Sequence, residues 1–233
     1  MKTLKYLIFI ILVAGLFFPG CSRETNTATP NATVHFIDVG QGDSILIDYG
    51  VTEILIDGGE KNSGCVNYLH SYVDGDLEVM IATHTDADHI GGLIEVLTYY
   101  RVNHIWINGC TATSKTFTDF MNSINAEGAI IHQASLGDTI PAGELLFRVL
   151  NPPAKLFSGA NNNSIVLSFS FGDIDFLFTG DAEIKAEEAM LRQSVVYLPD
   201  VEILKAGHHG SRTASSPGFL NVIKPETVIY ICA

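Results

Sequence analysis

Short runs of apolar and β-branched residues, separated by glycine, fill the chain from Val34 onward. Such runs predict strands, whereas longer stretches with apolar residues at helical spacing predict helices. The expected strands are 34–39, 44–49, 53–56, 77–83, 104–108, 130–133, 138–140, 145–150, 164–171, 174–178, 201–206 and 227–232; the expected helices are 66–72, 90–100, 117–125 and 182–192. Two strand-rich halves, each closed by helices, predict an α+β fold: an αββα sandwich of two sheets with helical outer layers.

The first 20 residues have a different pattern. Lys2 and Lys5 precede an uninterrupted apolar run from Leu7 to Phe18, which is too short to span a membrane but typical of a signal peptide. Cys21 follows Gly20 as in a lipobox, so we expect export, lipidation of Cys21 and attachment to a membrane surface. An uncleaved anchor and an ordinary secretory signal are the alternatives. Residues 21–33, rich in Thr, Asn, Ala and Pro, predict a flexible tether.

Length and composition limit the rest of the chain to one domain, residues 34–233. With 233 residues, 47% of them hydrophobic, the chain can bury one substantial core. Its net charge of −13 disfavours long-range attraction to nucleic acid, although bound metal ions would reverse that sign locally. Cys65, Cys110 and Cys232 have no close spacing and are interpreted as ordinary buried thiols.

The strongest chemical signal is the segment 81–92, where a buried strand leads into four potential ligands. His84 and Asp86 point the same way if the strand stays extended, because side chains alternate. Asp88 and His89 follow the turn and can face a second ion. Imidazole and carboxylate ligands without thiolate suit zinc, manganese or iron. The alternative is a solvated polar loop.

The His-x-Asp-x-Asp-His pattern of this segment resembles the metal motif of the metallo-β-lactamase superfamily, with Asp86 where many members carry histidine. This variant is similar to the hydrolase domain of ComEC-type competence proteins, which take up DNA. Segments 35–44, 55–59, 179–181 and 204–211 also match that subgroup. The resemblance implies a metallo-β-lactamase-type sandwich that binds two divalent ions, zinc or manganese.

The resemblance also assigns ligands beyond the motif. It implies that Asp181 bridges the two ions and that His208 completes the second site, with His209 as a supporting partner or proton donor. Asn161 or Ser164 stands where other members supply a third histidine and is expected to line the first metal. Taken alone, Thr-Gly-Asp more often forms a turn, asparagines mark loops, and adjacent histidines at a strand end usually face solvent.

Three further residues are expected to face the substrate or to support the ligands. Asp43 ends a glycine-rich segment, 40–43, that either approaches the substrate or forms a tight hairpin. Asp57 is expected to accept backbone hydrogen bonds and hold the metal loop. Lys205 belongs to the matching segment 204–211.

Two departures from the family pattern bear on the metal and on the domain's end. With Asp86 in place of histidine and no third histidine, the first site is poor in nitrogen, which favours manganese over zinc. The sequence also stops within an apolar strand, before a Tyr-Gly-His-Pro segment that relatives carry, so the domain is expected to be short at its C-terminus.

The expected reaction is hydrolysis by a metal-activated water, with Asp88 orienting the water and His209 protonating the leaving group. By analogy with ComEC-like domains, the expected function is that of an exported phosphodiesterase or nuclease acting on nucleic acid or another phosphodiester. The alternatives are a hydrolase of small esters, lactones or β-lactams, and a non-catalytic metal-binding surface lipoprotein.

Overall fold

A computed structural model describes residues 31–193, 198 and 200–231. The predicted signal peptide (1–20), the predicted lipidation site Cys21, most of the tether and Cys232 lie outside the described residues. The last tether residue, Thr33, belongs to the first strand instead. In the part of the chain that is described, no helix is long and apolar enough to cross a membrane.

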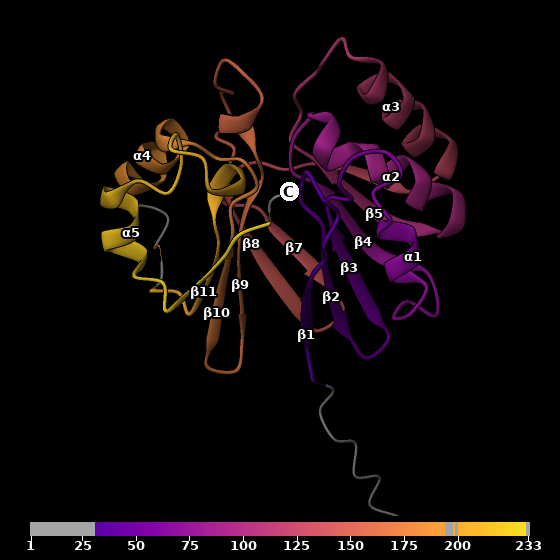
Figure 1. Ribbon diagram of the computed structural model, residues 1–233, viewed down its shortest axis with the longest axis horizontal. Coiled ribbons are helices and arrows are strands. Elements are labelled where there is room, and N and C mark those ends of the chain that lie inside the picture. The colour runs from indigo at the N-terminus through magenta and orange to yellow at the C-terminus, as the bar shows by residue number, and fades with distance from the viewer. Residues whose placement is uncertain (1–30, 194–197, 199, 232–233) are drawn as a thin grey trace, which may run out of the picture.

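Within the described residues, twelve strands form two six-stranded mixed sheets that face each other (Figure 1). The first sheet has the order β1 (Thr33–Phe36), β2 (Ile45–Tyr49), β3 (Thr52–Ile56), β4 (Leu77–Ala82), β5 (Val102–Ile107) and β6 (Ile130–Gln133). The second has the order β12 (Thr227–Ile229), β11 (Ile203–Lys205), β10 (Ile174–Phe178), β9 (Val166–Phe171), β8 (Leu145–Asn151) and β7 (Thr139–Ala142). Followed along the chain, each sheet starts with antiparallel strands, β1 to β3 in the first and β7 to β10 in the second. The later strands of each sheet pair in parallel.

Helices cover the outer face of each sheet. On one side lie α1 (Cys65–Leu69), α2 (Ala87–Tyr99) and α3 (Lys115–Glu127); on the other lie α4 (Ile184–Arg192) and α5 (Pro217–Ile223) (Figure 1). The main core lies between the sheets and includes Ile47, Phe147 and Phe169. Central strands β3 and β4 are buried on both faces, which explains their nearly continuous apolar sequence. The predicted αββα sandwich is confirmed.

Several element boundaries differ from the expected ones. Helix α2 begins at Ala87, three residues before the expected start, because Asp86 already has the extended backbone of an N-cap residue. Asp88 and His89 therefore lie in the first helical turn and not in a loop. Helix α5 was not predicted; Ser216 caps it by accepting a hydrogen bond from the Phe219 amide. Its seven residues are too few for a clear helical pattern.

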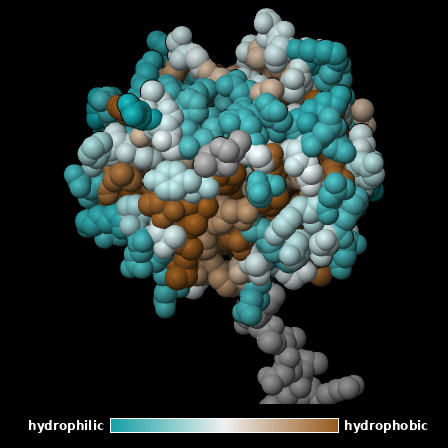
Figure 2. All heavy atoms as spheres, in the orientation of Figure 1, coloured by the Kyte–Doolittle hydropathy of each residue, from teal (hydrophilic) through white to brown (hydrophobic). Residues whose placement is uncertain are grey.

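The sandwich brings the ends of three parallel strands to one edge. Strands β4, β10 and β11 all lead there, and each is followed directly by a segment with candidate ligands. Hydrophilic residues gather over this region in the upper middle of Figure 2, above a more apolar surface.

Candidate metal centre

The turn from β4 into α2 holds the first four candidate ligands in a confined space. Glycine at positions 91 and 92 lets the helix approach the neighbouring loop, since a Cβ at Gly92 would lie 1.9 Å from the carbonyl oxygen of Gly58. This close packing fixes His89, which is fully buried, beside His84, which is 1% exposed. The centroids of the two imidazole rings are 4.1 Å apart.

Three imidazoles converge on the carboxylate of Asp181, which follows β10. The Nε2 atoms of His84, His89 and His209 lie 3.8, 3.3 and 3.5 Å from its nearest oxygen. All three Nε2 atoms are buried without a hydrogen-bond partner, as is Oδ1 of Asp181. Buried polar atoms are rarely left unpaired because their desolvation is costly. Bound cations would satisfy these four atoms, so the donor set fits divalent metal.

The opposite nitrogen of each ring is held by the protein. Nδ1 of His89 contacts the Asp57 carboxylate at 2.8 Å, and Nδ1 of His84 contacts the Thr83 hydroxyl at 3.1 Å. Nδ1 of His209 lies 2.9 Å from the carbonyl oxygen of Ile231, which can only accept, so this nitrogen carries the proton. The Nε2 lone pair of His209 is then available to a metal, as in histidine ligands held by a second hydrogen bond.

The two carboxylates of the motif lie next to different imidazoles. Asp86 is near His84, with 3.7 Å between carboxylate oxygen and Nε2, whereas Asp88 is 3.5 Å from Nε2 of His209. The donors therefore form two groups that overlap at His89. Two triads contain well-placed ligand atoms: His84, His89 and Asp181, and Asp88, His89 and His209.

Two other acidic residues lie close enough to join such triads but are engaged elsewhere. Asp43 forms a buried ion pair with Lys205, which also donates to the Gly180 carbonyl at 2.9 Å. Asp57 accepts hydrogen bonds from the Thr83 amide at 2.8 Å and its hydroxyl at 2.6 Å. We therefore assign Asp43 and Asp57 to support of the site and not to the ligands.

His208 and His209 occupy a tight turn after β11, and both have left-handed backbone with φ of 48° and 53°. This conformation is strained in residues other than glycine and ends the alternation that an extended strand would impose. The turn places His209 against Asp88 and Asp181. The family resemblance had implied His208 as the ligand at this position. His208 is 31% exposed in its side chain; its Nδ1 lies 3.3 Å from Glu183 and its Nε2 lies 3.8 Å from Asp181.

The predicted residues of the 161–164 loop lie next to this turn. The side-chain amide of Asn161 is 3.5 Å from the His208 ring, on the exposed side of the centre. Ser164 is buried, and its hydroxyl accepts a hydrogen bond from the Asp181 amide at 3.1 Å. Ser164 thus positions the backbone of Asp181, while Asn161 contacts His208.

The charges of the centre reinforce one another. Burial disfavours the charged form of His209, but the carboxylates of Asp43 and Asp88 outweigh it and raise the pKa of His209 to about 10. Burial also works against ionised Asp181, yet His89, His84 and Lys205 hold the pKa of that carboxyl far below its usual range. The site is therefore built around fixed negative charge that attracts either protons or a cation.

Sequence reasoning missed two residues at the centre. Gln41 donates from its amide to the Asp88 carboxylate at 3.0 Å, and Glu183 receives the Thr213 hydroxyl at 2.8 Å beside His208. Glu183 stands two positions after Asp181 in the sequence, which was the only available signal. Gln41 lies in the 40–43 segment that was expected to approach the substrate.

A family model described as the metallo-β-lactamase superfamily matches residues 33–233. The chain belongs to this superfamily, whose members are generally metal-dependent hydrolases. Its αββα fold and the ligand-like cluster agree with that membership.

Curated relatives place the chain in the ComEC-like subgroup. It is 27% identical to ComE operon protein 3 of Bacillus subtilis, over 97% of this chain and 30% of that protein. It is 30% identical to competence protein ComA of Neisseria gonorrhoeae, over 94% of this chain and 29% of that protein. It is 29% identical to recombination protein 2 of Haemophilus influenzae, over 86% of this chain and 24% of that protein. The chain thus spans less than a third of the length of these relatives.

Solved structures share the fold at low sequence identity. The similarity to a mutant of the β-hydroxylase CmlA covers 88% of this chain and 46% of the CmlA chain, with a TM-score of 0.60 and 14% sequence identity. The similarity to a metallo-β-lactamase from Staphylococcus aureus covers 82% of this chain and 60% of that chain, with a TM-score of 0.52 and 18% sequence identity. These similarities extend to the fold alone.

Proposed function

We propose that this chain is an exported metal-dependent hydrolase that cleaves phosphodiesters, with nucleic acid as the substrate class. The observation that carries the proposal is the convergence of three unpartnered buried Nε2 atoms on Asp181. Relatives named for competence and recombination support a nucleic-acid substrate. The pattern of residues 1–21 supports export and attachment to a membrane surface.

The residues divide into two proposed metal sites that share Asp181. His84 and Asp86 would hold one ion; Asp88, His89 and His209 would hold the other. Zinc and manganese both suit this mixture of imidazole and carboxylate. Two bound divalent ions lower the pKa of a water molecule and stabilise negative charge on a phosphoryl oxygen.

The remaining chemistry belongs to the side chains around these sites. Gln41 fixes the Asp88 carboxylate, so that Asp88 is held in one orientation toward a reacting water. His208 is exposed toward the substrate side, and Glu183 holds its Nδ1. We therefore assign protonation of the leaving group to Nε2 of His208 and ligand binding to His209, which exchanges the roles that the sequence predicted for them.

A panel of substrates tests the proposed function directly. The purified domain, loaded with zinc or with manganese, is assayed on single-stranded DNA, bis-p-nitrophenyl phosphate, a lactone and a β-lactam. We expect cleavage of the two phosphodiesters and its loss in Asp181→Ala. Asp173→Ala, at the exposed turn between β9 and β10, serves as the matched control. Hydrolysis confined to the lactone or β-lactam would replace the proposed substrate class, and metal binding without turnover would favour the non-catalytic lipoprotein.

A further inference from the structure

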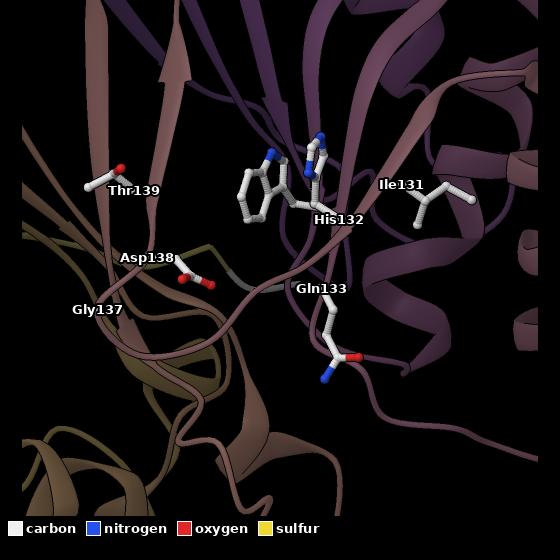
Figure 3. Close-up of a pocket in the computed structure, with 7 residues that line it drawn as sticks. Ile131, His132, Gln133, Gly137, Asp138 and Thr139 are labelled. Carbon is white, nitrogen blue, oxygen red and sulfur yellow. The ribbon is translucent and has the colours of Figure 1, made fainter.

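An open cavity lies at the side of the sandwich, between edge strand β6 of one sheet and edge strand β7 of the other. It is a surface depression of about 580 Å³ that is wide open to solvent. In Figure 3, His132 lies on one side of this cavity, with Asp138 and Thr139 across from it. None of these residues takes part in the metal centre.

One wall of the cavity is aromatic and rigidly held. Trp106 of β5 and His132 of β6 are stacked, with ring centroids 4.4 Å apart and planes 13° from parallel. His132 is fixed in turn by a 3.0 Å contact between its Nε2 and Nδ1 of His104. His132 covers one face of Trp106, the indole also packs against the core between the sheets, and the part of it that stays exposed lines the cavity. A planar ring can therefore pack against the exposed part of this rigid pair at little cost in side-chain ordering.

The other walls offer hydrogen-bonding groups. One oxygen of Asp138 accepts the Ser135 amide at 2.8 Å, and among the described contacts its other oxygen has no such partner. Gln133 and Thr139 add an amide and a hydroxyl, which both donate and accept. An aromatic face beside a carboxylate and neutral polar groups suits a nucleobase with an amino group.

The cavity lies at the same end of the sheet as the metal centre. Ala82, Ile107 and Gln133 are aligned across the parallel strands β4, β5 and β6, and His84 follows Ala82 by two residues. Two strand spacings separate Gln133 from β4, roughly 10 Å. The cavity is therefore within a few nucleotides of the metal centre along one nucleic-acid strand.

We propose that this cavity binds one base of a single-stranded DNA substrate, a few nucleotides from the bond at the metal centre. The inference rests on the proposed phosphodiester substrate, which it makes more specific. Stacking on Trp106 provides affinity for every base, and Asp138 favours bases that carry an amino group over thymine. Recognition by stacking also suits a chain whose net charge is −13, because it needs no basic surface.

Trp106 is the only tryptophan of the chain, so its fluorescence reports on this cavity alone. The full domain is titrated in EDTA and low salt with dAMP, dTMP, deoxyribose 5-phosphate and a hexamer of deoxyadenylate. We expect saturable fluorescence changes with the base-bearing ligands, tighter binding of dAMP than of dTMP, and tightest binding of the hexamer. Equal affinity for the hexamer and dAMP would overturn binding of a strand. A response to deoxyribose 5-phosphate equal to that of dAMP would overturn base recognition.

Substitutions in the cavity test whether the nucleotides bind there. Calorimetry replaces fluorescence for the variants that lack the tryptophan. Trp106→Ala should weaken hexamer binding about 5- to 100-fold, and Trp106→Phe, which keeps a ring, should restore most of it. Asp138→Ala should weaken dAMP binding about tenfold. Asp173→Ala should leave both unchanged. If Asp138→Ala and Asp173→Ala behave alike and Trp106→Ala binds normally, the cavity is not the site.

Because EDTA removes metal, these measurements are independent of turnover. Phosphodiester cleavage by the metal-loaded protein without base binding would overturn the cavity and leave the proposed function standing. Base binding without phosphodiester cleavage would support the cavity and count against the proposed function.

Discussion

At the scale of single residues, the two adjacent histidines after β11 differ in what holds them. His209 donates from Nδ1 to a backbone carbonyl and presents a buried Nε2 to Asp88 and Asp181. His208 is more exposed and has Glu183 beside its Nδ1. A ligand and a proton donor need these two different environments.

His209→Ala should therefore lose metal together with activity. His208→Ala should keep metal and fold but turn over roughly 10²- to 10⁴-fold more slowly, because a general acid is lost. Its defect should shrink on a substrate with a good leaving group, which needs no proton. Metal analysis and kinetics on both variants check this. Loss of metal in His208→Ala alone would restore the assignment that the sequence predicted.

The pKa of His209 also predicts how metal binding responds to pH. Held at about 10 without a cation, His209 carries an extra proton at neutral pH, which a metal ion must displace. Metal affinity should therefore rise with pH and binding should release protons. Calorimetry of metal binding to the wild type, in buffers of different ionisation enthalpy, measures that release. Affinity independent of pH from 6 to 9 would contradict the prediction.

The sequence predicted most of the centre because most donors are close together along the chain. His84, Asp86, Asp88 and His89 fall within six residues at the end of a buried strand, and Asp181 follows another strand. The exchange of roles that we propose for the two histidines follows from two consecutive left-handed residues, neither of which is glycine, and nothing in the sequence indicated that conformation. Glu183 and Gln41 had only their positions in the sequence to suggest a role, because their contacts with His208 and Asp88 are tertiary.

At the scale of elements, strands were predicted better than helix ends. Runs of β-branched and apolar residues gave every strand within a few residues, because both sheets are covered on both faces. The start of α2 was placed too late, since the apolar run begins at Ile90 while the helix begins at Ala87. Asp86 is the N-cap residue of α2, but its side chain makes no capping hydrogen bond that would mark the start of the helix.

The pairing of β3 with β4 brings two acidic side chains together. Glu53 is 3% exposed, and burial together with the charge of Glu78 raises its pKa from 4.5 to about 7. Since the folded pKa lies above the unfolded one, the folded state holds an extra proton between these values. The stabilising contribution is complete below pH 4.5 and is lost as pH rises through 7.

Glu53→Gln should remove this dependence. The variant should melt at a higher temperature than the wild type at pH 8 and show no gain at pH 5, because glutamine is neutral throughout. Thermal unfolding at both pH values, with Asp173→Asn as an exposed control, measures the difference. An equal shift at the two pH values would indicate a packing effect and not titration.

At the scale of the whole molecule, the signal peptide predicted for residues 1–20 bears on where we expect the protein to be found. We expect the full-length protein to partition into detergent with membranes, because residues 1–20 resemble a signal peptide and Cys21 a lipidated residue. Cys21→Ser should release the protein from membranes or leave the precursor unprocessed. Cell fractionation with antibody detection locates the wild type and the Cys21→Ser variant. Wild-type protein found free in the cytoplasm would contradict export.

The metal centre also joins the two halves of the sandwich. His84, Asp88 and His89 belong to the first sheet and its helix, whereas Asp181 and His209 follow strands of the second. Lys205 of β11 and Asp43, which precedes β2, make a buried ion pair across the same boundary. Metal held by these residues would bind the folded arrangement and not the separated halves, so its binding energy would add to the stability of the whole domain.

Asp181→Ala should therefore abolish metal-dependent stabilisation. At a metal concentration of about 100 Kd, a single site adds roughly 2.7 kcal/mol to the free energy of unfolding, which for a domain of this size is a rise of several degrees in Tm. The wild type and Asp173→Ala should show this rise on addition of zinc or manganese, and Asp181→Ala should not. Scanning calorimetry with and without EDTA separates the metal effect from any change in the metal-free fold. If Asp181→Ala gains as much as the wild type, then Asp181 does not hold metal between the sheets.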